Sequence, residues 1–208
     1  MSNGPKPLLI FLSCKNEFCE SRPPYLHYSL LTTHYSLLTI MNIRRGREAD
    51  LPQVLALIQE LAEYEKAPQE VTNTLADMQR DGFGPEPIFK FFVAEDAAGV
   101  IIGIALYYTA YSTWKGRMLF LEDLVVTENQ RGTGLGRQLF DAVVAEARQT
   151  GANRMKWQVL KWNEPAIGFY KKLGANLDPE WDNGNLSHEQ LHAHACHPAA
   201  EAAVQQGE

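Results

Sequence analysis

Length, composition and charge set the first limits on this chain of 208 residues. With 45% apolar residues, it is long enough to bury the core of one domain with extensions. It has no apolar run near the ~20 residues that a membrane helix needs, and its net charge of −6 argues against a non-specific nucleic-acid binder. Its three cysteines, an odd number without framework spacing, argue against a disulfide scaffold and favour the reducing cytoplasm.

The first 40 residues differ in character from the rest of the chain. Residues 27–32 (HYSLLT) recur at 34–39, and neither copy has helical or clean strand periodicity. The pattern changes at Met41. We therefore expect residues 1–40 to be a leader that is disordered or not native, with Met41 as the natural start. The alternative is a genuine, mobile N-terminal arm.

From Met41 the pattern predicts one α/β domain over about residues 41–177. A short strand precedes a helix whose apolar stripe starts at Leu51, and Asp50 with Gln53 resembles a capping box. A short helix, three strands, an amphipathic helix, a short strand and a last helix follow. The predicted ranges are, in chain order, 51–62, 74–80, 90–95, 101–111, 117–126, 135–149, 155–160 and 163–173.

The pattern weakens in residues 178–208, which we expect to be a partly disordered extension. Ser187 with Gln190 is suited to cap a short helix, and the end from Pro198 is expected to be disordered. Residues 188–192 (HEQLH) match the H-E-x-x-H motif of zinc metalloproteases, but the glycine and third histidine of metzincins are missing at their offsets. A zinc-binding or proteolytic tail therefore stays an alternative, and the main prediction includes no metal.

Residues 121–136 (LEDLVVTENQRGTGLG) carry the strongest chemical signal. An apolar strand leads into a glycine-rich turn, and an amphipathic helix follows. Glycines let the backbone approach a bound group, and the N–H donors at a helix N-terminus suit a phosphate or pyrophosphate. The Rossmann pattern fails because Arg137 occupies its last glycine position, and Walker A fails because no Gly-Lys-Ser/Thr follows. An R-x-x-G-x-G loop remains, with Glu122 and Asp123 just upstream.

This loop and several other motifs in the same order resemble the GNAT superfamily, and more narrowly the diamine (spermidine/spermine-type) and thialysine N-acetyltransferases. The resemblance covers about residues 42–175. Its further motifs are 61–66 (LAEYEK), 81–84 (DGFG), 111–117 (YSTWKGR), 121–123 (LED), 162–165 (WNEP) and 169–170 (FY). It implies an α/β GNAT fold, with a mixed central sheet splayed around the acetyl-CoA site and helices on both faces. It also implies an acyltransferase that moves an acetyl group from acetyl-CoA to a small primary amine by direct attack.

The resemblance also implies two catalytic residues. An amine with a pKa near the ~10.4 of Lys is protonated at pH 7, so a carboxylate must take its proton, and Glu122 is the predicted base. Asp123 is expected on the opposite face if the strand is regular, whereas a bulge would change that. Tyr170 is the predicted general acid for the leaving thiolate. The alternative is that Phe169 and Tyr170 only pack the last helix.

The same match gives the expected binding residues. Backbone donors of the loop are expected to hold the pyrophosphate, and Asn163 is expected to cap the last helix and to contact the cofactor. The predicted cofactor-binding residues are Leu124, Val125, Val126, Arg131, Gly132, Thr133, Gly134, Leu135, Gly136, Arg137, Asn163, Pro165 and Tyr170. The predicted substrate-binding residues are Tyr64, Glu65, Trp114, Glu122 and Asp123.

The amine and the assembly are less determined. Polyamine-acetylating members carry an extra acidic residue where this chain has Ser112, which favours a thialysine or lysine-like amine. Trp114 and Tyr111 could instead close the core. Relatives of this type are usually homodimers with composite sites, so we expect a homodimer without nucleic-acid or membrane partners. The strand that usually follows Gly174 is hard to find. A non-catalytic acyl-CoA-binding domain is the alternative function.

Overall fold

The computed structural model describes residues 41–205, so the expected leader lies outside the described residues. Within this part of the chain, five strands form one sheet in the order β1-β2-β3-β4-β5. The strands are β1 (Asn42–Arg45), β2 (Lys90–Glu95), β3 (Ile101–Ser112), β4 (Gly116–Val126) and β5 (Arg154–Lys156). Strands β1 to β4 pair antiparallel with one another in this order, whereas β5 runs parallel to β4. The sheet is therefore mixed, as predicted.

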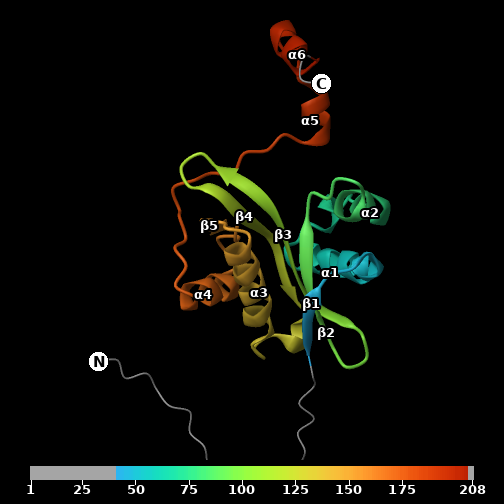
Figure 1. Ribbon diagram of the computed structural model, residues 1–208, viewed down its shortest axis with the longest axis vertical. Helices are drawn as coiled ribbons and strands as arrows, with labels where there is room; N and C mark the ends of the chain where they lie inside the picture. The colour runs from blue at the N-terminus through green and yellow to red at the C-terminus, as the bar shows by residue number, and fades with distance from the viewer. Residues whose placement is uncertain (1–40, 206–208) are drawn as a thin grey trace, which may run out of the picture. The chain divides into compact units, whose positions relative to one another are not determined.

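Helices cover both faces of this sheet (Figure 1). α1 (Leu51–Tyr64) and α2 (Leu75–Phe83) lie on one face, and α3 (Leu135–Gln149) and α4 (Glu164–Lys172) lie on the other. Each face buries its own apolar cluster, so neighbouring residues of β4 divide between them: Val125 packs on the α1 side and Val126 on the α3 side. Three short 3-10 helices and two later helices complete the described chain. These are Glu48–Asp50, Pro68–Glu70, Glu128–Gln130, α5 (His188–Ala193) and α6 (Pro198–Gln205).

The predicted elements occur in the predicted order, with three differences. α2 continues through Gly82 to Phe83, so residues 81–82 do not end it. β5 ends at Lys156 rather than residue 160, because its pairing with β4 stops there. The residues from Pro198, expected to be disordered, form α6. Residues 157–205 contain no further strand.

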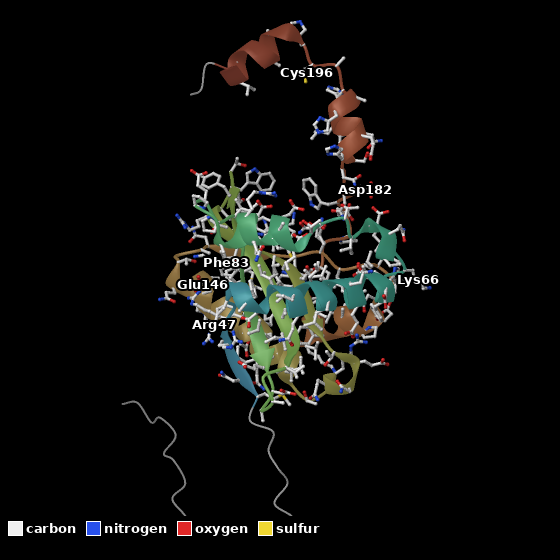
Figure 2. All side chains as sticks on the ribbon, turned by 90° about the vertical axis from the view of Figure 1, so that its right-hand side faces the viewer. Arg47, Lys66, Phe83, Glu146, Asp182 and Cys196 are labelled. Carbon is white, nitrogen blue, oxygen red and sulfur yellow. The ribbon has the colours of Figure 1, made fainter. Side chains whose placement is uncertain are left out.

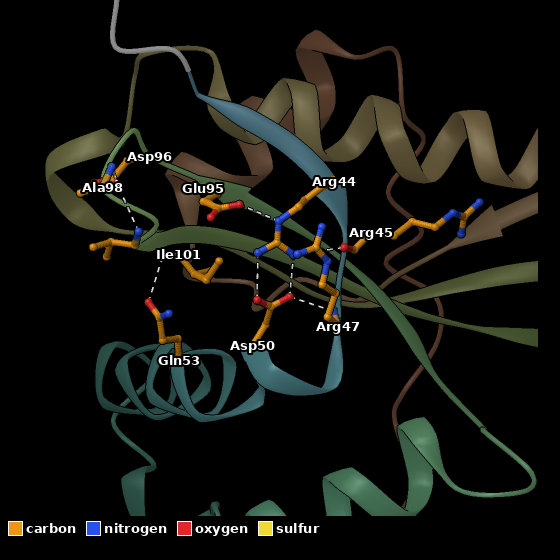
Figure 3. A network of polar contacts seen from close by, with 10 residues as sticks. Arg44, Arg45, Arg47, Asp50, Gln53, Glu95, Asp96, Ala98 and Ile101 are labelled. Atoms are coloured by element: carbon orange, nitrogen blue, oxygen red, sulfur yellow. Dashed lines mark hydrogen bonds and ion pairs between the residues drawn. The ribbon is translucent and has the colours of Figure 1, made fainter.

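A polar network joins β1 and β2 to the start of α1 (Figure 3). The guanidinium of Arg44 donates to both carboxylate oxygens of Asp50, at 2.7 and 2.9 Å, and its Nε donates to Glu95 at 2.6 Å. The backbone N–H of Arg47 donates to Asp50 at 2.7 Å. These hydrogen bonds, that from Arg44 first, lower the pKa of Asp50 although the residue is only 7% exposed. The buried charge is thus fully partnered.

The same network overturns the capping box predicted for Asp50 and Gln53. Asp50 precedes α1 but its side chain makes no cap hydrogen bond to this helix. The side-chain oxygen of Gln53 instead accepts a hydrogen bond from the backbone N–H of Ile101, at 3.0 Å. Both side chains therefore serve tertiary contacts with partners that a local motif does not contain.

α1 ends where the candidate site begins. The N–H of Glu65 donates to the carbonyl of Leu61 at 2.9 Å, which closes the last turn after Tyr64. Lys66 then adopts a left-handed backbone with φ 61° and turns the chain out of the helix, and its side chain is exposed at this end of α1 (Figure 2). This turn fixes the positions of Tyr64 and Glu65. None of the helices within residues 41–205 is long and apolar enough to cross a membrane.

Candidate active site

A β-bulge interrupts β4 at Glu122. Leu121 pairs with Tyr107 and Asp123 pairs with Leu106, so Glu122 is an extra residue without a partner on β3. The extra residue shifts the alternation of side chains by one, and Glu122 and Asp123 therefore share a face of the sheet. Opposite faces were expected only for a regular strand, and the structure shows the bulge that was named as the alternative.

Packing on either side of the bulge confirms this shift. Leu121 and Leu124 both pack against the α3 side, although they are three residues apart. The charge of Glu65, at the end of α1, raises the pKa of Asp123, and the charge of Glu122 raises the pKa of Tyr108. Both carboxylates therefore face the α1 side of the sheet.

β4 and β5 part next to the bulge. Their pairing covers residues 118–120 and 154–156 and then stops. Beyond Phe120 no strand within residues 41–205 pairs with the β5-side edge of β4, so the backbone groups on that edge have no strand partner. This gap corresponds to the splayed region of the sheet that the family resemblance implied.

Asp123 lies in this region among groups of like charge. Burial raises the pKa of Asp123 to about 6, and the charges of Glu122 and Glu65 add to the shift. Burial also raises the pKa of Glu65. No cationic side chain within the described residues lowers the pKa of Asp123. A carboxylate with such a pKa is mostly ionised at pH 7 and can accept a proton, as a general base must.

Tyr170 brings a second proton-bearing group from α4 to the same place. Burial raises its pKa to about 12, and the charge of Asp123 adds to the shift. The phenol is therefore protonated at neutral pH, and it lies within reach of the charge of Asp123. Its ring centroid lies 4.9 Å from that of Trp157 and 6.1 Å from that of Phe140. Tyr170 thus packs α4 and also reaches the predicted site.

The glycine loop presents a row of free backbone donors. Gly132 and Gly134 have φ values of 79° and 91°, which favour glycine, and a Cβ at either would meet no atom within 4 Å. The N–H groups of residues 132–137 have no acceptor among the described residues, and no side chain caps α3. Consecutive N–H groups without acceptors at the start of a long helix suit a phosphate or pyrophosphate.

Two side chains of this loop donate hydrogen bonds to nearby backbone carbonyls. Thr133 Oγ1 donates to the carbonyl of Gln130 at 2.7 Å, and Arg131 Nε donates to the carbonyl of Val126 at 3.1 Å. The predicted residues Thr133 and Arg131 therefore shape the loop itself. Arg137 points along α3 and pairs with Asp141 at 2.7 Å.

Tyr64 joins the loop to the start of α4. The guanidinium of Arg131 lies 5.2 Å from the centroid of the Tyr64 ring, and Tyr64 Oη donates to Asn163 Oδ1 at 3.4 Å. The Trp162 ring lies 5.7 Å from Tyr64. Asn163 Oδ1 also accepts from the N–H of Ala166 and so caps α4 as predicted. The structure thus brings Tyr64, Arg131 and Asn163 together.

Trp114 is not brought to this site within one chain. Trp114 and Tyr111 are 83% and 76% exposed at the end of the β3–β4 hairpin, so the interpretation that they close the core is wrong. The stretch of β4 from Gly116 to Glu122 spans about 20 Å at ~3.3 Å per residue. That length separates Trp114 from both carboxylates.

The histidine motif of the tail lies on the six-residue helix α5. The rings of His188 and His192 are 4.2 Å apart. In the described part of the chain no group of three His, Cys, Asp or Glu side chains could hold a metal ion.

Sequence reasoning missed Trp157. This residue follows β5 directly, packs against Tyr170, and has a buried Nε1 without a hydrogen-bond partner in the described residues. Its place at the end of a short strand is the one signal in the sequence that could have drawn attention to it.

Comparison with known proteins identifies the family of this chain. Residues 52–175 match the model of the acetyltransferase (GNAT) family. The chain is 39% identical to the thialysine N-epsilon-acetyltransferase of Bos taurus over 145 residues, which are 66% of this chain and 85% of the relative. It is 36% identical to spermidine/spermine N(1)-acetyltransferase-like protein 1 of Homo sapiens over 158 residues, 72% of this chain and 23% of the relative.

Solved structures share the fold. An integron cassette protein from Vibrio cholerae has a TM-score of 0.61 at 22% identity, covering 73% of this chain and 95% of that one. The aminoglycoside N-acetyltransferase AAC(6')-Iy in complex with CoA has a TM-score of 0.59 at 21% identity, covering 72% and 96%. The predicted fold class and enzyme class are confirmed, and this chain belongs to the acetyltransferase (GNAT) family.

Proposed function

We propose that the protein acetylates a small primary amine of the thialysine, lysine or diamine type. The observation that carries this proposal is that Asp123, whose pKa is about 6, lies near enough to the protonated Tyr170 for its charge to raise the pKa of that phenol, beside the gap between β4 and β5. The first supplies a proton acceptor and the second a proton donor, which aminolysis of a thioester requires. The names of the thialysine and spermidine/spermine relatives support the amine class.

The loop before α3 is the proposed site of the coenzyme phosphates. The free N–H groups of residues 132–137, which include Leu135, Gly136 and Arg137, would hold the pyrophosphate. Leu124, Val125 and Val126 offer the open edge of β4, while Asn163 and Pro165 stand at the start of α4. Acetyl-CoA, when bound, supplies the acetyl group as a thioester.

Glu122 and Asp123 are proposed to act as a carboxylate pair. Glu122 is exposed on the bulge and Asp123 lies deeper, coupled to Tyr170. Because both face the α1 side, the pair can take the proton that a protonated amine must lose, and we assign its acceptance to Asp123 with Glu122 at the entrance. Tyr170 Oη holds the proton that the leaving thiolate needs.

The negative charge around the site favours a cationic substrate. The charges of Glu65 and Glu122 both act on Asp123, and Tyr64 stands beside Glu65 at the end of α1. A second positive charge on a lysine-like amine would lower the cost of this cluster. Ser112 in place of an acidic residue supports a thialysine or lysine-like amine over a polyamine.

We further propose a cytoplasmic homodimer. The exposed Tyr111 and Trp114 at the β3–β4 hairpin suit coverage by a second copy, and Trp114 keeps its predicted substrate role only in such a composite site. The free, exposed Cys196 is consistent with a reducing compartment. Sedimentation equilibrium tests the dimer, and a monomer at micromolar concentration would contradict it.

A thiol-release assay tests the function directly. Purified protein and acetyl-CoA are mixed with thialysine, lysine, ornithine, putrescine and spermidine in parallel. We expect thiol release with at least one amine, and a higher kcat/KM for thialysine or lysine than for spermidine. Coenzyme A binding without thiol release from any amine would instead support the non-catalytic acyl-CoA-binding alternative.

A further inference from the structure

The histidine-rich tail is a feature that acetyl transfer does not use. Residues 188–197 contain four of the six histidines of the chain and one of its three cysteines. Imidazole and thiolate are the protein ligands that late transition metals prefer, and short tracts rich in His and Cys are typical of metal binding. The arrangement of these side chains in the structure therefore matters.

A capping box places the start of α5 directly before the first of these histidines (Figure 1). The backbone N–H of Gln190 donates to Ser187 Oγ at 3.2 Å, and the backbone N–H of Ser187 donates to the side-chain oxygen of Gln190 at 2.9 Å. The helix ends before His194, whose backbone is extended. His188 and His192 therefore lie four residues apart in one regular helical segment.

This spacing brings the two imidazoles together. Residues four apart in an α-helix are neighbours on one face. The ring centroids of His188 and His192 are 4.2 Å apart, and the ring planes are inclined at 56°. Two nitrogens bound to one tetrahedral zinc ion at ~2.0–2.1 Å lie about 3.4 Å apart. Rings at the observed separation can therefore direct one nitrogen each to the same ion.

Both imidazoles are accessible from solvent. His188 and His192 are exposed, and the side-chain hydrogen bonds of this turn join Ser187 to Glu189 and Gln190 without using either ring. No third His, Cys, Asp or Glu side chain of residues 41–205 completes a cluster with the pair. Water would therefore fill the remaining coordination positions, which makes the site exchangeable, unlike a structural zinc site with four protein ligands.

We propose that His188 and His192 together bind one divalent transition-metal ion of the nickel, copper and zinc group. Imidazole suits these ions, whereas magnesium and calcium prefer oxygen ligands. A six-residue helix is only marginally stable by itself. An ion held by two successive turns binds the helical form alone and therefore stabilises α5. The tail is thus a metal-responsive segment, and its binding is independent of acetyl transfer.

Removal of one imidazole tests the pair by calorimetric titration of the whole protein. We expect the wild-type protein to bind Ni²⁺ and not Mg²⁺. His192→Ala should raise the Kd for Ni²⁺ by at least about tenfold, because even the loss of an outer partner of a metal ligand has an effect of this size. His194→Ala is the matched control, since it removes a histidine just beyond α5, and should leave the Kd unchanged. No binding of Ni²⁺ by the wild-type protein, or equal losses in the two variants, would overturn the proposal.

A second variant keeps the composition of the tail and changes only the spacing. His192→Ala combined with Ala193→His moves the second imidazole from about 40° to about 140° around the helix from the first. We expect the same loss of Ni²⁺ affinity as in His192→Ala alone. Retained affinity would mean that the tract binds metal whatever the order of its residues, and would overturn the assignment to this pair.

Amide hydrogen exchange tests the stabilisation of α5. The N–H of Leu191 donates to the carbonyl of Ser187 at 2.8 Å in the first turn. We expect exchange of residues 191–193 to slow when Zn²⁺ is added to the wild-type protein, and not when it is added to the double variant. Equal slowing in both proteins, or no slowing in the wild-type protein at saturating Zn²⁺, would contradict binding across the two turns.

Discussion

The fold shifts the pKa values of Asp50 and Asp123 in opposite directions. Asp50 accepts hydrogen bonds from Arg44 and Arg47, and its pKa is lowered. Asp123 has carboxylates as its charged neighbours, and its pKa is raised to about 6. A buried charge is stable when cations and N–H groups surround it, and otherwise it takes up a proton more readily.

The two positions also differ in the sheet around them. Asp50 sits beside β1, whose pairing with β2 is regular along its whole length. Asp123 sits at a bulge, where β5 has left β4. Hydrogen bonds from Arg44 and Arg47 hold the first carboxylate as a structural link, whereas the second lies where we propose that the substrate binds.

The largest expected effect concerns Tyr170, the neutral neighbour of Asp123. Tyr170→Phe removes the phenolic proton and keeps the ring that packs against Phe140 and Trp157. Because the leaving thiolate loses its donor, we expect turnover to fall by ~10²–10⁴-fold. The measurement is kcat for thiol release at saturating acetyl-CoA, with circular dichroism to confirm folding. Unchanged turnover would reduce Tyr170 to a packing residue.

Substitution of Asp123 tests its half of the comparison. Asp123→Asn should lower turnover by about 10²-fold, because the proton acceptor is gone, without lowering stability, because no cation loses a partner. Glu122→Gln is the matched control one residue away, and we expect it to lose less. The two kcat/KM values decide between the carboxylates. A larger loss in Glu122→Gln would return the role of base to Glu122.

Substitution of Asp50 should give the reverse result. Asp50→Asn breaks the bidentate pair with Arg44, so we expect the free energy of unfolding to fall by about 3 kcal/mol. Turnover per folded molecule should not change, since Asp50 lies outside the proposed site. Asp81→Asn is the control, because its partner Arg80 is 64% exposed and such pairs contribute ~0.2–1 kcal/mol. Equal losses in the two variants, measured by urea unfolding, would contradict the role of a structural link.

The sequence predicts the part of the site that is encoded locally. The order of β4, glycine loop and α3 follows from apolar periodicity and from glycines at positive φ, such as Gly134. The cap of α4 by Asn163 is equally local, because its acceptor and donor lie three residues apart. Such features depend on backbone geometry and near neighbours.

What the sequence did not predict depends on distant partners. Whether β4 is bulged at Glu122, which the sequence left open, is decided by the register with β3, and the contacts of Asp50 and Gln53 depend on Arg44 and Ile101. The unsatisfied N–H of Trp157 likewise follows from the packing of α3 and α4 around it. No local pattern contains this information, because it arises when the sheet assembles.

The two aspartates should finally respond to pH with opposite sign. The folded protein raises the pKa of Asp123 from 3.8 to about 6, so it binds this proton more tightly than the unfolded chain does. The resulting stability is present at low pH and is lost as the pH rises through 6. Asp50, with its lowered pKa, contributes stability above pH 3.8 that is lost only as the pH falls below this value.

Activity should follow Asp123 alone. Below pH 6 the proton acceptor is already filled, so kcat/KM should fall about tenfold per pH unit. A profile from pH 4.5 to 8 should show this limb in the wild-type protein and in Asp50→Asn, whereas the low residual activity of Asp123→Asn should lack it. If the limb persists in Asp123→Asn and disappears in Glu122→Gln, the group that titrates is the exposed carboxylate. The base would then be Glu122, and the buried Asp123 would only contribute to the environment of that base.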